Sequence, residues 1–428
     1  MNGKSRRAFA RVAGLGCAGM PFAAVVLLAA STSAIAGATE WELDLDARLV
    51  TSNGEKSFFR GGFGTLRFDE QTSGLQWGRI RLALNQNLGE VWSLHLDASS
   101  FGNDEQNPLD LTEAYLQFRP YPFDGFRARL KAGAFYAPIS LENRLAGWES
   151  PYTLSSSAIN TWVGEELRTV GLEGQIDWLG TRTGHLFDLA LTGAVFGWND
   201  PAGVVVARNG FMLNDRQSTL FGRVAQYGGP PPAQAPEVFR EIDGRPGAYA
   251  GLEARYLDRM VLRVLRYDNR GDPAVFDPSS HEFAWLTRFD SAGLRAESAS
   301  GWSAVAQWLD GQTFVEPRGT RFGWGFRSKF LLVSKRTGQH TFSVRYDSFD
   351  VASRQARSDD GDQHGHAWTA AYIFEPGTRW RFTLEWLSVW SDSDNRSDFG
   401  GLQIGADELL REHKLEAALR YAVGSAVK

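Results

Sequence analysis

The chain has 428 residues, with 45 Lys and Arg against 50 Asp and Glu, so its formal net charge is −5. Its single cysteine, Cys17, excludes an internal disulfide bond and a cysteine-based metal site. The acidic balance gives no sign of a nucleic-acid partner. Aromatic residues make up 13% of the chain, which is generous for a water-soluble protein.

The first segment predicts export. Residues 1–38 open with four basic side chains and continue with an apolar stretch from about Ala13 to Ala30. Ala34-Ile35-Ala36 and Ala36-Gly37-Ala38 then each offer small residues at a cleavage site. These features are typical of a secretory signal peptide, which leaves 39–428 as the exported chain. Removing four basic residues takes the formal net charge to about −9.

Beyond residue 38, apolar and polar residues alternate over short segments. In 380–386, two Trp, one Phe and one Leu alternate with Arg381, Thr383 and Glu385. Successive side chains of a strand point to opposite faces, so this segment predicts a strand with one apolar and one polar face. The same pattern predicts sixteen strands: 41–50, 75–86, 91–99, 110–119, 126–135, 166–178, 185–198, 247–257, 259–268, 282–297, 301–310, 321–334, 339–350, 365–375, 378–391 and 410–423.

Short and long connections alternate between these strands. Seven are short and rich in turn-forming residues. The other eight are long: 51–74, 100–109, 136–165, 199–246, 269–281, 311–320, 351–364 and 392–409. An up-and-down barrel in a membrane has short periplasmic turns on one side and long external loops on the other. We therefore predict an all-β fold, a transmembrane antiparallel up-and-down β-barrel of about sixteen strands.

The polar faces of the predicted strands point into the barrel and carry many charges. Six basic residues on the second to fifth strands form a predicted pore-lining wall: Arg79, Arg81, Arg119, Arg127, Arg129 and Lys131. Further pore-lining candidates are Glu113, Gln117, Arg381 and Glu385. A positive wall in a pore attracts anions. The acidic residues Asp97 and Glu113 on the intervening strands support a second interpretation, a lattice of salt bridges that only stiffens the wall.

Two long loops are candidates for more than a surface role. We expect 136–165 to fold inward as a constriction loop, with Tyr136, Glu142, Arg144 and Tyr152 as its candidate residues; the alternative is an external flap. The loop 199–246 contains a Gly- and Pro-rich run from Gly228 to Pro236, and we expect a mobile surface loop. Inward folding over the pore, or packing on a neighbouring subunit, is the alternative there.

Three segments resemble the phosphate-selective-porin-like outer-membrane proteins, most clearly within residues 75–180. They are Leu130-Lys131-Ala132-Gly133-Ala134-Phe135-Tyr136-Ala137-Pro138-Ile139-Ser140-Leu141-Glu142-Asn143, the stretch 110–116 and the stretch 165–174. The resemblance implies a sixteen-stranded porin, a trimer, and passage of anions or other small solutes. The phosphate-coordinating residues of that family have no residue-by-residue match, so phosphate selectivity is not implied. Such barrels end on an aromatic residue, whereas this chain continues from Tyr421 to Lys428.

The sequence therefore predicts an outer-membrane porin of a Gram-negative bacterium, a passive diffusion channel for small hydrophilic solutes. We expect no enzyme activity, no catalytic residue, no cofactor and no metal. The expected partners are outer-membrane lipid and lipopolysaccharide, the barrel-assembly machinery, small solutes or ions, and two further copies in a homotrimer. Two other classes remain: a barrel enzyme such as a lipid hydrolase, and a secreted β-rich carbohydrate-binding protein.

Overall fold

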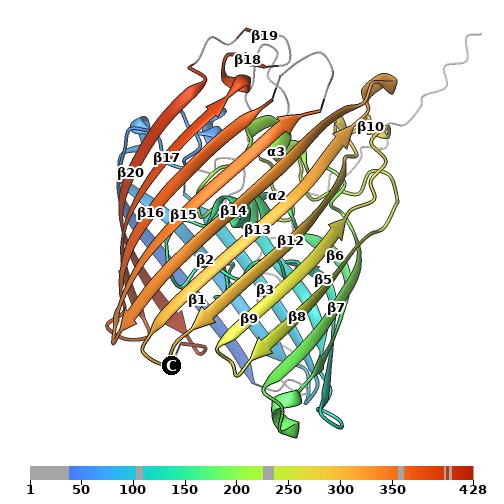
Figure 1. Cartoon of the computed structure of the whole chain (residues 1–428), viewed down its shortest axis with the longest axis vertical. Helices are drawn as coiled ribbons and strands as arrows, with labels where there is room; N and C mark the ends of the chain where they lie inside the picture. Colours follow the sequence, from blue (N-terminus) through green and yellow to red (C-terminus); the bar gives the residue numbers. More distant parts are fainter. Residues whose placement is uncertain are drawn as a thin grey trace, which may run out of the picture.

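The computed structural model describes residues 38–102, 109–224, 236–354, 361–399, 402–403 and 407–427, and most of them form one closed antiparallel β-barrel (Figure 1). Each barrel strand is hydrogen-bonded to the next, and β20 closes on β1. The sixteen strands are Thr39–Ser52 (β1), Gly74–Asn87 (β2), Trp92–Phe101 (β3), Asp110–Phe118 (β4), Phe126–Phe135 (β5), Thr169–Trp178 (β6), Phe187–Gly197 (β7), Gly247–Tyr256 (β8), Met260–Asp268 (β9), Leu286–Glu297 (β12), Trp302–Val315 (β13), Phe322–Thr337 (β14), His340–Ser353 (β15), Gln363–Phe374 (β16), Trp380–Ser393 (β17) and Leu409–Gly424 (β20). The predicted signal peptide lies outside the described residues except for Ala38.

The barrel confirms the predicted fold class, and every predicted strand segment coincides with a barrel strand. The largest shift of a strand end is in β13, which continues five residues past its predicted end and pairs with β14 up to Val315 and Phe322. As a result, the connection 316–321 is shorter than the turn 179–186. It is still longer than the turns 298–301 and 338–339 on either side of it, so short and long connections alternate along the chain as predicted.

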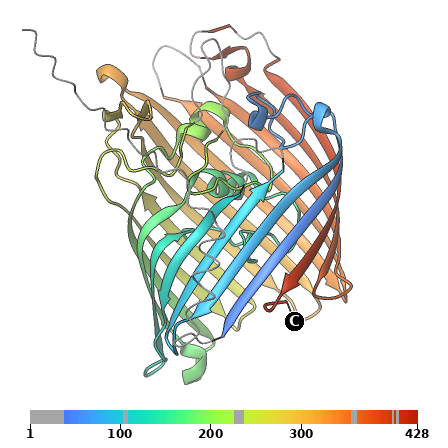
Figure 2. The same cartoon turned by 180° about the vertical axis from the view of Figure 1, so that it is seen from behind.

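The short turns lie on one rim of the barrel and the long loops on the other, as Figures 1 and 2 show. The β8–β9 turn places Leu257 and Asp258 at φ of 47° and 54°. Two successive positive φ values define the type I′ turn, whose twist matches that of the flanking strands. The described chain ends meet on the same rim, where the Trp41 backbone N–H donates to Ser425 Oγ at 2.9 Å.

The outer face of the barrel is apolar, as the alternation predicts. Leu384 is 47% exposed while its neighbour Thr383, which points inward, is 5% exposed. Leu415 and Leu419 on β20 are likewise exposed, whereas Lys414 and Glu416, on either side of Leu415, are buried inside. The two faces of β17 and β20 are therefore assigned correctly by the sequence pattern.

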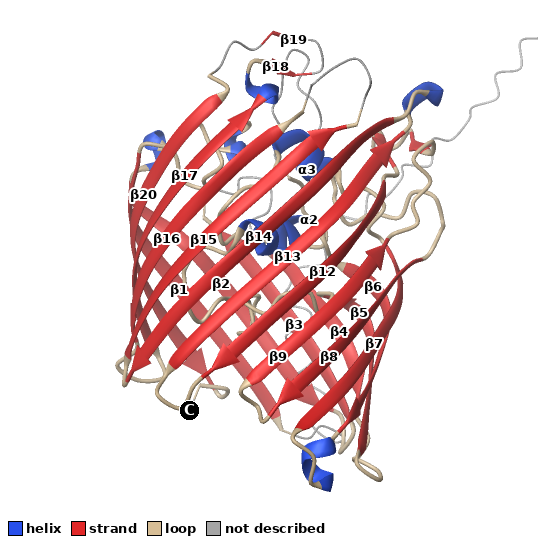
Figure 3. Ribbon diagram, in the orientation of Figure 1, coloured by secondary structure: helices blue, strands red, loops and turns tan. Residues whose placement is uncertain are grey.

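The interior differs from the uniformly polar lumen that we predicted. Inward apolar side chains of β9 and β12–β15, such as Leu265, Phe289, Leu309, Phe330 and Phe349, pack in a buried cluster with the loops that enter the barrel. Two helices belong to these loops, α2 (Ala158–Glu166) and α3 (Val204–Asn209), and Figure 3 shows α2 inside the ring of strands. Apolar side chains on this half of the wall are kept from water by protein, and the charged side chains concentrate on the other half.

The structure corrects the prediction made for the loop 199–246. Residues 199–224 are mostly buried, and Ala202, Val206 and Leu213 have no exposed surface, whereas most of 236–246 is partly or fully exposed. The expectation of a surface loop is therefore wrong for 199–224, because the apolar residues of this part pack on the inner wall. Residues 225–235, which hold most of the Gly- and Pro-rich run, lie outside the described residues.

The remaining described elements are short. They are the 3-10 turns η1 (Phe58–Arg60), η2 (Glu70–Thr72), η3 (Gly180–Thr183), η4 (Pro317–Gly319) and η5 (Asp394–Arg396), and the two-residue strands β10 (Phe276–Asp277), β11 (Glu282–Phe283), β18 (Asp398–Phe399) and β19 (Leu402–Gln403). Neither of the described α-helices has the length and hydropathy that a membrane-crossing helix requires.

Candidate functional site: the loop that crosses the lumen

The segment between β5 and β6, residues 136–168, crosses the interior of the barrel, and we call it the lumenal loop. It leaves the wall at β5 and binds β15 and β17 through its middle part. In the closed order of strands, β15 is eight strands from β5 in either direction, which places the two on opposite sides of the barrel. The segment predicted as a constriction loop therefore spans the full width of the lumen.

Helix α2 fixes this loop to the apolar half of the wall. Ser157 caps the helix by accepting a hydrogen bond from the Asn160 backbone N–H at 3.3 Å, a common arrangement at helix starts. Every residue of α2 is buried. Trp162 packs its ring against Phe289 and Phe326, with ring centroids 5.4 and 4.9 Å apart. The helix is thus held by packing rather than by exposed polar contacts.

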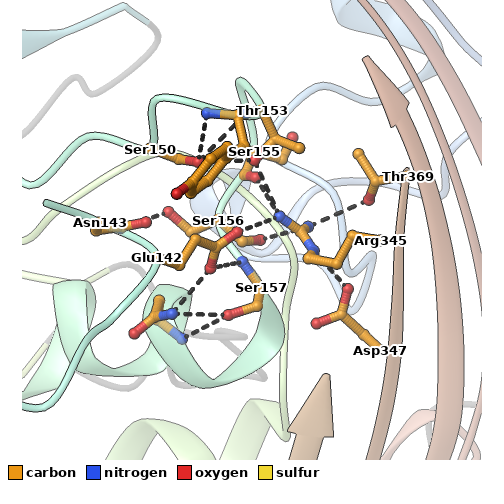
Figure 4. A network of polar contacts seen from close by, with 12 residues as sticks. Glu142, Asn143, Ser150, Thr153, Ser155, Ser156, Ser157, Arg345, Asp347 and Thr369 are labelled. Atoms are coloured by element: carbon orange, nitrogen blue, oxygen red, sulfur yellow. Dashed lines mark hydrogen bonds and ion pairs between the residues drawn. The ribbon is translucent and has the colours of Figure 1, made fainter. Parts of the chain in front are cut away.

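A buried polar network around Arg345 of β15 holds the next part of the loop (Figure 4). The Arg345 guanidinium lies 2.6 Å from Glu142 Oε1 and 2.7 Å from Asp347 Oδ2, and none of the three side chains is exposed. It also donates to the carbonyls of Ser155 and Ser156 at 2.7 and 2.9 Å.

The two carboxylates of this network also accept hydrogen bonds from the loop. Glu142 Oε2 accepts from the Ser157 N–H at 3.0 Å, and Asp347 Oδ1 accepts from the Ala158 N–H at 3.1 Å. Buried charges are costly unless they are paired and hydrogen-bonded, so this network ties the loop firmly to β15.

A second anchor lies on β17. Glu385 accepts hydrogen bonds from the Leu154 and Ser155 backbone N–H groups at 2.6 and 3.0 Å. Glu385 points inward as predicted, but the loop covers it completely. It therefore lines no open passage here, which corrects its assignment as a pore-lining residue.

Free space at the edge of the lumenal loop lies against the charged half of the wall. A cavity of about 40 Å³ is lined by side chains of β1, β2, β17 and β20 and by residues 148–156 of the loop. Glu149 of the loop forms ion pairs with both Arg79 of β2 and Arg420 of β20. Arg381 of β17 lines the same cavity and donates to the Ser150 carbonyl at 2.9 Å.

The charges on the far side of this cavity balance one another. Arg48 contacts Asp46, Asp215 and Glu416, and Asp215 also accepts from Arg67 at 3.0 Å. Lys414 pairs with Glu416. These three basic and three acidic side chains leave the cluster of Arg79, Arg381 and Arg420 as a local excess of positive charge. We call these three residues the arginine cluster.

Most of the predicted basic wall is neutralised by neighbours. Arg127 lies 2.8 Å from Asp177 and Lys131 lies 3.4 Å from Glu173, whereas Arg129 donates to the uncharged side chain of Gln175. Arg81 is buried and lies 2.6 Å from Asp97 and 3.0 Å from Asp44. These contacts are those of the salt-bridge lattice that we weighed as the second interpretation.

Three other predicted pore-lining residues, one from the basic wall and two acidic or neutral ones, differ in position. Arg119 lies past the end of β4, in the turn to β5, and is exposed on the rim of short turns, because the strand ends at Phe118. It therefore does not line the lumen. Glu113 accepts from the Tyr136 backbone N–H at 3.2 Å, where the lumenal loop begins. Gln117, opposite Lys131 in the strand register, is partly exposed.

The residues predicted for the constriction loop differ in their exposure to water. Tyr136 is buried, stacks on Trp148 with ring centroids 4.1 Å apart and donates to Gln217 at 2.6 Å. Arg144 is 40% exposed at its side chain and lies 2.9 Å from Glu297, near the rim of short turns, while Tyr152 beside them is buried. Water therefore reaches the loop from the short-turn side.

Sequence reasoning missed Arg345 and Glu149 as site residues. Arg345 and Asp347 alternate with the outward residues Val344 and Tyr346, so the period of two does mark them as inward. The pattern carries no information on which loop side chain meets them. Glu149 lies in a segment without any period, and its partners come from opposite ends of the chain.

The outer loops bring three carboxylates together, those of Asp200, Glu241 and Asp243. Burial, and to a smaller extent the two neighbouring carboxylates, raises the pKa of Asp200 to about 6. Backbone N–H groups of residues 242 and 243 donate to Asp200. The Glu241 and Asp243 carboxylates also accept hydrogen bonds from backbone N–H groups, and we assign no metal to this group.

Comparisons with known proteins support the fold. No protein-family model matches the sequence, and no match was found among curated proteins. Solved structures do match. A loop-deletion mutant of OmpT, an outer membrane protein of Vibrio cholerae, is similar with a TM-score of 0.52 and 7% identity, covering 90% of this chain and 99% of that one. The outer membrane channel DcaP of Acinetobacter baumannii gives 0.50 and 9%, covering 90% and 96%. A trimer form of the Vibrio protein gives 0.50 and 7%, covering 91% and 100%.

Proposed function

We propose that this protein is an outer-membrane porin, a passive diffusion channel for small hydrophilic solutes with a preference for anions. The observation that carries the proposal is a closed sixteen-stranded barrel whose own β5–β6 loop crosses a charged lumen. A barrel of this strand number is wide enough to enclose an aqueous channel. The proposal needs no catalytic group, because selectivity follows from the size and charge of the narrowest section.

The outer surface supports a place in a membrane. On β15, Phe342, Val344 and Tyr346 face outward between His340 and Asp350. Ten residues span ~33 Å along a strand, or ~25 Å along the barrel axis at a tilt of ~40°, which matches the apolar band of outer-membrane barrels. Charged residues end the band at the long-loop side and pair across strands: Arg266 with Asp290 and Arg327 with Asp310. We place this row at the level of lipopolysaccharide head groups.

The anion preference rests on the arginine cluster. Its three positive charges face the Glu149 carboxylate, and a second carboxylate, that of Glu375, lies 3.9 Å from Arg381. Inward charges at a narrow section set the local potential for ions within about a Debye length, roughly 10 Å at 0.1 M salt. The excess of positive charge at the edge of the loop therefore favours anions there.

We also propose that three copies assemble. A trimer form of the Vibrio cholerae protein has a similar fold. Cross-linking of the detergent-purified protein tests the trimer, which is the expected product, whereas a monomer would contradict it.

Entry into the membrane would use a signal peptide and the barrel-assembly machinery, as the sequence predicts.

The experiment that tests the function is incorporation of the purified protein into planar lipid bilayers. We expect stepwise increases of ionic current as single channels insert. Liposomes that contain the protein should also swell in small sugars at rates that fall with solute size. A folded barrel that produces neither current steps nor swelling would overturn the proposal.

A further inference from the structure

Glu149 occupies a position in which a soluble anion would be expected. Its two carboxylate oxygens bind Arg79 and Arg420, which come from strands on either side of β1. Arg420 and Arg381 are direct neighbours across the β17–β20 ladder, and both point into the barrel. Like charges directly opposite each other destabilise a strand pair unless an anion lies between them and other groups. The chain supplies that anion from its own lumenal loop.

The same arginines hold the turn that carries Glu149. Arg79 donates to the Gly147 carbonyl at 2.9 Å, and Arg381 donates to the Ser150 carbonyl at 2.9 Å. Within this turn, Trp148 has a φ of 58°, a left-handed conformation that is uncommon for a residue with a side chain. Stacking on Tyr136 and a hydrogen bond from Trp148 Nε1 to the Asn160 carbonyl at 3.1 Å keep it there. The turn is therefore positioned by contacts at both of its ends.

The site is reachable from water. Glu149 and Arg420 are partly exposed, and the cavity beside them is lined on one side by the arginine cluster. Arg420 lies near the end of β20, and Arg381 near the start of β17, both toward the rim of short turns. A small solute can thus approach the arginines from the short-turn side without displacing α2.

We propose that the arginine cluster is a binding site for small carboxylates, and that Glu149 is its tethered internal ligand. A soluble carboxylate competes with Glu149 for Arg79 and Arg420 and loosens the Gly147–Ser150 turn when it binds. The ligand class follows from the resident group, since a planar guanidinium binds a carboxylate through paired N–H donors. This inference rests on the proposed channel function and assigns its binding site.

The test compares the wild-type channel with the E149Q variant in planar bilayers. Acetate, the soluble form of the same group, is added on both sides while the chloride current is recorded. Tethering gives an internal ligand a high effective concentration, so wild-type channels should resist acetate. We expect E149Q to reach half inhibition of the chloride current at an acetate concentration at least about tenfold lower.

Two controls make the result specific. E90Q removes the same charge on the exposed rim of short turns, where Glu90 contacts only Tyr121 in the described structure. We expect E90Q to match the wild type, whereas E149D, which keeps the charge, should lie nearer to the wild type than E149Q. Equal half-inhibiting concentrations in wild type and E149Q would overturn the inference. Absence of current in the wild type would instead overturn the channel function itself.

A second variant guards against a folding defect in E149Q. The predicted exported chain has no cysteine, so E149C can be labelled after folding. A methanethiosulfonate reagent that adds a sulfonate should restore resistance to acetate, and one that adds a trimethylammonium group should not. The same effect from both reagents would overturn the inference, because only the negative charge distinguishes them.

Discussion

Replacing Arg345 by Leu should release the lumenal loop while leaving the barrel closed. Arg345 is completely buried and is the single cation between Glu142 of the loop and Asp347 of its own strand. The R345L variant leaves two carboxylates buried without a positive partner and removes the hydrogen bonds to the Ser155 and Ser156 carbonyls. Removing one partner of a buried ion pair costs about 3–5 kcal/mol.

This loss of free energy weakens the docking of the lumenal loop and not the barrel, because β15 is held in the sheet by backbone hydrogen bonds to β14 and β16. A change of about 3–5 kcal/mol shifts the equilibrium between docked and released loop by a factor of about 10² to 4 × 10³. We therefore expect larger and noisier single-channel currents, together with protease cleavage within residues 136–168 that the wild type resists. Heat-modifiable gel mobility should show that the barrel remains folded.

The matched control is R327L. Arg327 also pairs with an aspartate, Asp310 at 2.5 Å, but its side chain is 65% exposed on the outer face. Exposed pairs contribute only about 0–1 kcal/mol, so R327L should leave current and cleavage unchanged. If R345L conducts and resists protease as the wild type does, the loop is not held by this network and our account of the site is wrong.

Three further predictions test other parts of the account. Placing Asp at Leu384, which faces outward, should reduce the yield of heat-modifiable barrel more than Asp at the inward Thr383, by a cost on the order of 1–3 kcal/mol; equal yields would refute the facing assignment. Replacing the arginine cluster by Gln should shift the zero-current potential toward cations by more than replacing Arg127, Arg129 and Lys131 does, because only the arginine cluster lies at the edge of the lumenal loop. A larger shift from the second set would instead support the predicted basic wall as the selective element. The raised pKa of Asp200, about 6 in the folded protein against 3.8 as its ordinary value, means that its ionised form destabilises the outer loops; this penalty is complete above pH 6 and is relieved progressively as the pH falls from about 6 to about 3.8. Proteolysis of residues 240–245 should therefore be slower at pH 5 than at pH 7, and D200N should remove the difference.

The strands and their facing follow from the sequence because a membrane barrel imposes the same period on every strand. Lipid requires apolar residues outside, and alternation then assigns the remaining residues to the inside, as Leu384 and Thr383 illustrate. The interior follows less directly. The run Phe330-Leu331-Leu332-Val333 in β14 has apolar residues on both faces, and this run is the signal that protein covers the inner wall there.

The arginine cluster could be predicted only in part. Arg79 and Arg381 were both expected to face the lumen, but their proximity depends on barrel closure, which pairs the first strand with the last. The basic wall was expected because its residues lie on strands that follow one another in the sequence. The next strand, β6, is also a neighbour of β5, and it places Asp177 and Glu173 beside Arg127 and Lys131. The docking of loops depends on tertiary packing, for which no local period exists.

The zero-current potential across a potassium chloride gradient tests the central claim most directly. The wild-type protein is reconstituted in a planar bilayer with about tenfold more salt on one side, at low total ionic strength so that the lumen charges are weakly screened. The account predicts a potential whose sign shows chloride crossing more readily than potassium, and a smaller potential when both salt concentrations are raised. A potential of the sign for potassium, or a folded barrel that passes no current, would contradict it.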